Sequence, residues 1–158
     1  VEESLNLVNE ILQKINTIKK KTFRIKPKIY FEEWDDPYIS ATRWVSEIIE
    51  ISGGVDIFAK KSRSQKALKR AVSSQDVINK NPDIIFASWC GKKVNFDKIK
   101  KRQGWSSINA VKTNSLFEIK SPIILQPGPA ALTDGLSQIH NLILQWQKSQ
   151  ICSNEGFL

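Results

Sequence analysis

Apolar residues recur at helical spacing near both ends of the chain. In the amino-terminal part, Val1, Leu5, Val8, Leu12 and Ile15 follow one another at intervals of three and four residues. The same spacing returns in Leu132, Leu136, Ile139, Leu142, Ile143 and Trp146. The pattern predicts a helix over residues 1 to about 20 whose apolar stripe is buried, and a last helix followed by a polar, frayed tail after Lys148.

Between these helices, short apolar runs alternate with amphipathic stretches. Strands are predicted at Ile29–Phe31, Ile84–Ala87 and Ile123–Leu125, with weaker ones at Ala110–Val111 and Phe117–Ile119. Helices are predicted from near Tyr38 or Ser40 to Ser52, ended by Gly53 and Gly54, from Ser73 to Asn79, and over residues 95–102, while residues 55–72 are mostly irregular. Alternation of apolar strands and helices predicts an α/β fold: a three-layer sandwich with a mainly parallel sheet, preceded by a long helix.

Recognition groups cluster where the predicted strands end. Glu32, Glu33, Trp34, Asp35 and Asp36 follow the first strand directly, and Trp89 follows the second. Open α/β sheets bind ligands at the carboxyl ends of their strands, so these junctions are the candidate site. The rings of Trp34, Tyr38 and Trp89 offer flat walls for a large planar ligand, or else they close the end of the sheet.

The four carboxylates allow several roles. Alternation along an extended segment sends Glu33 and Asp35 to one side and Glu32 and Asp36 to the other, so one side can hold an acid–base pair or a hard metal ion. In the alternative reading, Asp36 caps the following helix ahead of Pro37 and the other carboxylates are solvated. Contact with a ligand is the third possibility.

Composition narrows the function further. The net charge of +8 lies in separate basic runs, and the acid-free run from Lys60 to Arg70 contains no aromatic residue to stack on bases. A solvated basic face or attraction to an anionic membrane therefore fits better than nucleic-acid binding. A single histidine, His140, and two cysteines, Cys90 and Cys152, form no metal-binding or disulfide framework. Phosphate-loop, dinucleotide and nucleophile-elbow motifs are also missing from the sequence, which argues against an enzyme.

Four blocks carry a resemblance to a known family: residues 31–40, 43–54, 81–93 and 123–136. From about residue 24 to 147 the chain resembles cobalamin-binding proteins, the substrate-binding components of ABC importers in the iron-siderophore and cobalamin class. The resemblance implies a two-lobed periplasmic-binding-protein fold. In that scheme residues 1–22 form the interlobe helix, 23–148 the carboxyl-terminal lobe and 149–158 a polar tail, and the amino-terminal lobe of the parent chain is missing.

The resemblance also implies a function and a site. Cobalamin or a related corrinoid would be transported cargo rather than a cofactor, held between two lobes in the periplasm or another extracytoplasmic space and delivered to a membrane permease. Haem or a ferric siderophore is the alternative cargo, and a small enzyme using Glu33 and Asp35 a further alternative. The cleft-facing residues would be Trp34, Asp35, Tyr38 and Trp89, with Glu33, Lys92 and Gln126 as further candidates. Gln75 and Asp76 occupy the place where related proteins carry a permease-docking glutamate.

Overall fold

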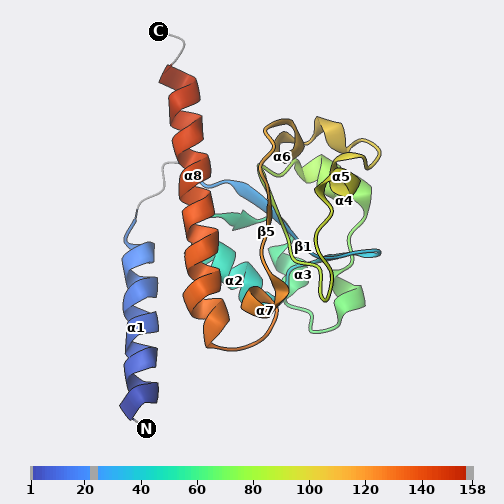
Figure 1. The fold of residues 1–158 in the computed structure, drawn as a ribbon. Helices are drawn as coiled ribbons and strands as arrows, with labels where there is room; N and C mark the ends of the chain where they lie inside the picture. The colour runs from blue at the N-terminus through green and yellow to red at the C-terminus, as the bar shows by residue number, and fades with distance from the viewer. Residues whose placement is uncertain (1, 22–24, 156–158) are drawn as a thin grey trace.

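A computed structural model describes residues 2–21 and 25–155 of the chain, and for residues 153–155 the backbone only. Figure 1 shows a sheet between two groups of helices, with two long helices along one side. The helices are α1 (Glu2–Lys19), α2 (Arg43–Ile51), α3 (Ala59–Ser62), α4 (Ser74–Lys80), α5 (Phe96–Lys100), α6 (Asn109–Lys112), α7 (Ser121–Ile124) and α8 (Leu136–Glu155). Short turns η1 (Ala67–Arg70), η2 (Trp105–Ser107) and η3 (Ala131–Gly135) lie between them.

The sheet is mixed but mainly parallel. Its strands are β1 (Lys28–Asp35), β2 (Tyr38–Ser40), β3 (Val55–Asp56), β4 (Ile84–Ala87) and β5 (Leu116–Glu118). Strand β1 pairs in parallel with β3 and with β4, and β4 pairs in parallel with β5. The short β2 folds back antiparallel onto the end of β1 through a turn with a cis Asp36–Pro37 peptide bond. The predicted three-layer α/β fold is confirmed.

Alternate residues of the central strands belong to two separate hydrophobic cores, one on each face of the sheet. Ile29, Phe31, Ile84 and Phe86 pack with α2, α7 and α8 on one face, whereas Tyr30, Ile85 and Ala87 pack with α4, α5 and α6 on the other. Because every one of these residues is fully buried, both faces of the sheet are covered, as parallel sheets require. The helices thus fix β1 and β4 rigidly up to their carboxyl ends.

Two helix ends have the features predicted from the sequence: glycines after α2 and a capping box at the start of α4. Helix α2 ends at Ile51, and Gly53 then adopts a φ of +99°, a left-handed conformation that favours glycine. Next to it, Gly54 lets α2, β1 and α8 approach closely, since an added Cβ would collide with Ile29. At the start of α4, Ser73 and Asp76 form the predicted reciprocal capping box.

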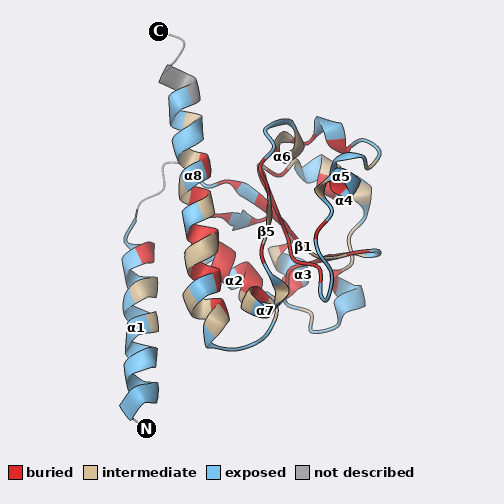
Figure 2. Ribbon diagram, in the orientation of Figure 1, coloured by how far each residue is buried: buried red, intermediate tan, exposed pale blue. Residues whose placement is uncertain are grey.

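Helix α1 forms as predicted, but its apolar stripe is not buried. Among the described residues of this helix only Ile18 is buried, while Leu5, Val8 and Leu12 are each more than half exposed. Figure 2 shows the helix exposed along nearly its whole length. Its contacts with the rest of the chain lie near its carboxyl end, where Ile15 and Ile18 pack against the core and Lys14 donates a hydrogen bond to the Thr133 carbonyl.

Other local predictions need correction. Ala110–Val111 lies in α6 and Ile123–Ile124 in α7, because an apolar pair alone does not separate a buried strand from a buried helical turn. Residues 38–40 form β2 rather than the start of a helix, and α2 begins only at Arg43. The tail is helical to Glu155. The boundary predicted between residues 22 and 23 lies outside the described residues.

His140 is a buried residue of α8, as its helical spacing predicted. Its Nδ1 lies 3.1 Å from the Ser52 carbonyl oxygen and its Nε2 lies 3.4 Å from Nζ of Lys21. Burial, together with the nearby Lys21 charge, keeps the pKa of His140 below its ordinary value. The side chain therefore joins α8 to the end of α2 and to the segment after α1. Cys90 and Cys152 are both exposed and free.

Candidate ligand-binding rim

Strands β1, β4 and β5 run parallel, so their carboxyl ends meet at one edge of the sheet. This edge, with the loops that follow β1, β4 and β5, is called the rim below. It carries most of the predicted site residues, and three of its carboxylates, those of Glu32, Glu33 and Asp35, each pair with a cation from another part of the chain.

Glu32 is the most deeply buried charge of the rim. Its carboxylate accepts two hydrogen bonds from Arg102, at 2.6 and 2.9 Å, one from the Trp89 indole at 3.0 Å and one from the Tyr30 hydroxyl at 3.1 Å. Burial lowers the pKa of Arg102, but the hydrogen bonds and charge of Glu32 outweigh it and the net shift is upward. Glu32 is therefore a structural anion that orients Trp89 and Arg102.

Arg102 also covers aromatic surface. Its guanidinium carbon lies 4.2 Å from the centre of the Tyr38 ring and 4.4 Å from that of Trp105. Both distances lie in the range of cation–π contacts, in which arginine is the more frequent cation. The half-buried Tyr38 is therefore supported at the rim by Arg102 and by the edge contact of its ring with Trp105.

Asp35 bridges two lysines at the end of β1. Its oxygens accept hydrogen bonds from Lys92 at 2.5 Å and from Lys98 at 2.6 Å. Burial raises the pKa of Asp35, but the hydrogen bonds and charges of the two lysines outweigh it, and its pKa lies below the ordinary value. The carboxylate is nearly inaccessible, while the lysine side chains are 42% and 55% exposed. The single carboxylate of Asp35 thus forms ion pairs with two lysines whose side chains remain accessible to solvent.

Lys92 brings the two candidate tryptophans together. Its ammonium lies 4.2 Å from the centre of the Trp34 ring and 5.0 Å from that of Trp89. Trp34 is half-buried, and its indole donates to the Asp36 carbonyl at 2.9 Å. Trp89 is only 4% exposed, so it supports the rim from below and offers no open face. The predicted aromatic wall therefore consists of Trp34 and Tyr38.

Glu33 and Asp35 do not form the predicted pair on one side. The register of β1 shifts between Glu32 and Trp34, a bulge that breaks strict alternation. Glu33 binds Arg70, which also donates to the Ser40 carbonyl, whereas Asp35 binds lysines from the other side of the strand end. The predicted capping role of Asp36 is also wrong, because Thr42 occupies the position before α2.

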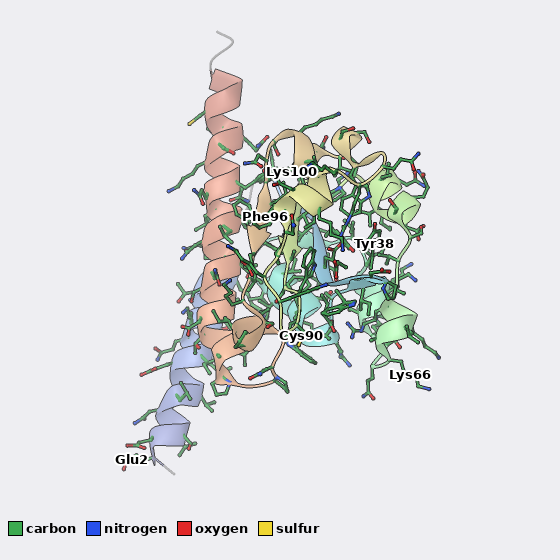
Figure 3. All side chains as sticks on the ribbon, turned by 45° about the vertical axis from the view of Figure 1, so that its right-hand side comes forward. Glu2, Tyr38, Lys66, Cys90, Phe96 and Lys100 are labelled. Atoms are coloured by element: carbon green, nitrogen blue, oxygen red, sulfur yellow. The ribbon has the colours of Figure 1, made fainter. Side chains whose placement is uncertain are left out.

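A hollow of about 410 Å³ opens beside these groups. Asp35, Tyr38, Val72, Ser74, Lys98 and Arg102 line it, with Asp36 and Pro37 at its margin. Figure 3 shows Tyr38 on the side of the molecule where strand β1 ends. The lining combines one aromatic ring, two apolar side chains, a hydroxyl, two cations and two carboxylates, a mixed composition suited to a ligand with both apolar and polar parts.

Of the predicted ligand-binding residues, only Asp35 and Tyr38 line this hollow. The residues predicted beside them, Glu33, Trp34, Trp89 and Lys92, are not among its lining residues, and the other predicted residues also lie outside it. Gln126 is exposed in the loop after α7. Gln75 and Asp76 are exposed at the start of α4, where hydrogen bonds from Ser73 hold the pKa of Asp76 below its ordinary value. Both side chains are bound within their own helix, because Asp76 forms the capping box and the Gln75 amide donates to the Asn79 side chain at 2.8 Å.

Sequence reasoning missed three cations, Arg70, Lys98 and Arg102, that hold the carboxylates of the rim. The sequence carried a partial signal for two of them, because a basic helix follows Trp89 and its cap, Asn95, is recognisable. Helical spacing places Lys98 and Arg102 on the same face, four residues apart. Arg70 gave no such signal, since it lies in a run of lysines and arginines that looks uniform.

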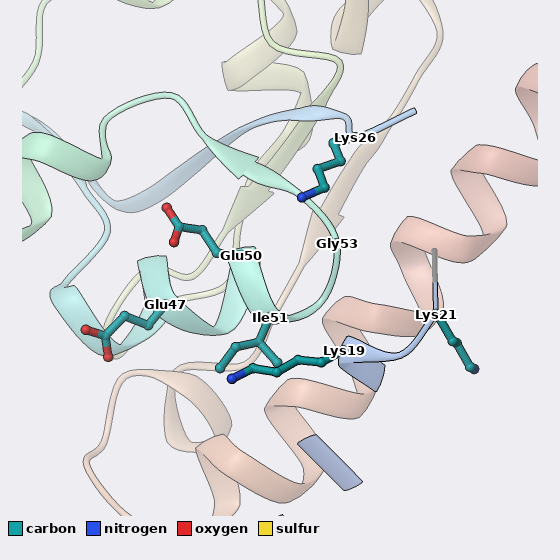
Figure 4. A pocket seen from close by; sticks show the side chains of 7 residues that line it. All are labelled: Lys19, Lys21, Lys26, Glu47, Glu50, Ile51 and Gly53. Atoms are coloured by element: carbon teal, nitrogen blue, oxygen red, sulfur yellow. The ribbon is translucent and has the colours of Figure 1, made fainter. Parts of the chain in front are cut away.

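A second hollow, of about 620 Å³, lies at the other end of the sheet between the end of α1 and helix α2. Figure 4 shows Lys19, Lys26, Glu47 and Glu50 around it. No predicted site residue lines this hollow. Its walls include the segments before β1 and β3, the opposite end of the strands from the rim.

Two classes of site are not found in the part of the chain that the structure describes. No group of three or more histidine, cysteine, aspartate or glutamate side chains is arranged to hold a metal ion. Likewise, none of the described helices combines the length and apolar character that a membrane-spanning helix needs.

Known proteins share this fold and part of its sequence. An uncharacterized ABC transporter substrate-binding lipoprotein, YvrC, of Bacillus subtilis (strain 168) is 24% identical over 135 residues, which are 84% of this chain and 39% of that protein. The vitamin B12 binding protein BtuF of Vibrio cholerae superposes with a TM-score of 0.68 at 22% identity, over 93% of this chain and 55% of that one. The heme-binding protein RhuT of Roseiflexus sp. RS-1 gives 0.68 at 19% identity, over 90% and 57%.

The chain thus spans between about two fifths and three fifths of the length of these relatives. Residues 2–123, most of the chain, match the family described as periplasmic binding protein. The match begins in α1 and runs through β1, β4 and β5 into α7, so it contains the carboxyl ends of the strands that form the rim. On this match, the protein belongs to the periplasmic binding protein family.

Proposed function

We propose that this chain is a ligand-binding lobe of the substrate-binding component of an ABC importer, and that its cargo is cobalamin or a related corrinoid. The observation that carries the proposal is the hollow at the rim, where Tyr38, Lys98 of α5 and Arg102 just after α5 surround an opening at the ends of parallel strands. The described contacts favour binding over chemistry, because Glu32, Glu33 and Asp35 are each held by cations and are poorly placed to transfer protons.

The dimensions of the hollow support a shared site. At about 410 Å³ it takes part of a bulky planar ligand and leaves the rest to be covered by other groups. We expect those groups to come from a second lobe of the parent protein. Trp34, Asp35, Tyr38 and Lys92 would then contact the cargo on this lobe, with Glu33 and Trp89 holding them in place and Gln126 approaching from the loop after α7.

The charge of the rim bears on the choice of cargo. Lys92 and Lys98 pair with Asp35, and the charge of Asp36 also acts on Lys98, so acids and bases are balanced beside Trp34 and Tyr38. The exposed ammonium groups of the two lysines can still contact an anionic group of a planar ligand, which both cobalamin, through its phosphodiester, and haem, through its carboxylates, provide. Haem and ferric siderophores are therefore the alternative cargoes, and BtuF and RhuT carry the corresponding ligands in their names.

The wider proposal concerns location and partners. An extracytoplasmic position, with delivery to a membrane permease, would match the description of YvrC as a substrate-binding lipoprotein of an ABC transporter. Gln75 and Asp76, exposed at the start of α4, are the proposed permease contacts on this lobe.

Tryptophan fluorescence tests the proposal, because cobalamin and haem both absorb in the range of indole emission. Titration of the chain, and of its full-length parent, with cyanocobalamin, haemin or a ferric siderophore should give saturable quenching, tightest for cyanocobalamin. Tyr38→Ala should weaken binding, while Trp44→Phe, on the opposite side of the sheet, serves as the control. Tighter binding of haemin would reassign the cargo. A folded parent that binds none of the three would overturn the proposal.

A further inference from the structure

The segment from Ala59 to Val72 forms an acid-free basic surface beside the rim. It includes α3 and η1, and its exposed cations Lys60, Lys61, Arg63, Lys66 and Lys69 are called the basic patch below. None of these five forms an ion pair with a carboxylate among the residues that the structure describes. Figure 3 shows Lys66 pointing away from the body of the molecule.

An apolar side chain stands in the middle of the basic patch. Leu68 is 77% exposed, the highest value for a large apolar residue in the described parts of the chain. It lies in η1 between Lys66 and Lys69. Moving an exposed leucine side chain from water into an apolar environment is favourable. A partner that buries Leu68 must also accept the five cations of the basic patch.

The segment is held in place from below. Arg70 is buried, pairs with Glu33 and donates to the Ser40 carbonyl at 2.9 Å. The Ser40 hydroxyl donates in turn to the Arg70 carbonyl at 2.9 Å, and Lys61 donates to the Ala71 carbonyl. The carboxyl end of the turn that carries Leu68 is thus fixed to β2, and Leu68 is exposed in the folded structure without local unfolding.

We propose that the basic patch is a docking surface for an anionic lipid bilayer, with Leu68 inserted at the headgroup boundary. Each lysine or arginine near an anionic leaflet contributes to attraction, and one inserted apolar side chain adds a contact that free solution does not offer. Charge complementarity selects this occupant: residues 59–72 carry five exposed positive charges, no acidic residue and one protruding leucine, and the nearest acids on the Arg63 side are Glu47 and Glu50, which line a hollow with it.

Other partners fit these side chains less well. Single-stranded nucleic acid needs aromatic rings on which bases stack, and residues 59–72 contain none. The centres of protein–protein interfaces are depleted in lysine, whereas four of the five patch cations are lysines. Binding to a membrane surface requires neither stacking on bases nor a partner of complementary shape.

Docking in this way would also orient the rim. Val72 and Ser74, which line the rim hollow, follow the basic patch directly along the chain. The hollow therefore lies close to the patch, and a docked molecule would carry it near the bilayer. The proposal does not depend on the identity of the cargo.

Sedimentation with lipid vesicles tests the proposal. The full chain is mixed, at low ionic strength, with vesicles of phosphatidylcholine alone or of phosphatidylcholine with phosphatidylglycerol. We expect binding to the anionic vesicles only, weakened by added salt. Lys66→Glu/Lys69→Glu should reduce the affinity by about tenfold or more. Leu68→Ser, which leaves the charge unchanged, should reduce it by roughly fivefold or more.

A matched control separates the patch from net charge. Lys112→Glu/Lys148→Glu makes the same charge change at exposed positions on α6 and α8 and should leave vesicle binding nearly intact. Equal losses in the two double variants, or no effect of Leu68→Ser, would reduce the effect to bulk charge and overturn the proposal. Failure of the wild-type chain to bind anionic vesicles would overturn it as well. Circular dichroism of each variant verifies that the fold is retained.

Discussion

The rim and the basic patch use the same cationic residue types in opposite ways. At the rim, Arg102 and Arg70 are buried against Glu32 and Glu33, so their charges hold the end of β1 in shape. In the patch, the cations are exposed and face no carboxylate among the described residues. Burial decides the role, because a buried charge needs a partner within the fold and a solvated one remains available to a partner outside it.

The largest effect expected from this comparison follows the loss of Glu32. Glu32→Ala leaves Arg102 partly buried without its carboxylate, and also removes the acceptor for Trp89 and Tyr30. We expect the free energy of unfolding to fall by about 3–5 kcal/mol, measured by urea denaturation. The control is Glu47→Ala, which breaks the exposed Arg43–Glu47 pair and should cost no more than about 0.5 kcal/mol. Similar losses in both would remove the distinction between buried and exposed pairs.

A smaller loss is expected at the point where the two regions meet. Arg70→Met removes the bonds to Glu33 and to the Ser40 carbonyl but keeps an apolar stem. Because Glu33 is partly exposed and can be rehydrated, the free energy of unfolding should fall by about 1–3 kcal/mol. Hydrogen exchange should show faster opening of residues 67–72. Unchanged exchange there would mean that Arg70 does not hold the patch.

Acid titration sharpens the description of Asp35. Its pKa is lower in the folded chain than in the unfolded chain, so the ionised side chain stabilises the fold above about pH 4 to 5, and this contribution is lost as the pH falls through the folded pKa. Asp35→Asn should therefore be less stable than the wild type near neutral pH. The gap should close in acid, as followed by urea denaturation at several pH values. A gap independent of pH would contradict the ion-pair explanation.

The smallest effect is expected in the basic patch itself. Lys66→Glu/Lys69→Glu should change the free energy of unfolding by no more than about 0.5 kcal/mol, because neither side chain is buried or ion-paired among the described contacts. Thermal unfolding followed by circular dichroism measures the change. A loss comparable with that of Arg70→Met would show that these lysines belong to the folded framework.

Periodicity predicted the elements of the fold better than their partners. Both long helices were predicted from apolar spacing, yet Leu136, Ile139 and Ile143 of α8 are fully buried whereas Leu5, Val8 and Leu12 of α1 are exposed. Spacing reports which face of a helix is apolar, but burial also needs a surface to cover that face. The misassigned strands at Ala110–Val111 and Ile123–Leu125 have a related cause, since two or three apolar residues fit either period.

At the rim, residue types were predictable and their geometry was not. The position of Asp35, Tyr38 and Trp34 at a strand end followed from the parallel sheet. The side to which each carboxylate points depends on the bulge after Glu32, and the burial of Trp89 depends on Arg102 and Glu32, which lie 70 residues apart in sequence. Such long-range contacts leave no local pattern from which to predict them.

The antiparallel contact between the hairpin strand β2 and the segment after η1 has a mechanical consequence. Ile39 bridges Ala71, and the Val72 amide donates to the Tyr38 carbonyl at 2.9 Å. These contacts join the backbone of Tyr38 to the segment that follows Leu68. A displacement of the segment that carries Leu68 is therefore expected to shift the backbone of Tyr38 as well.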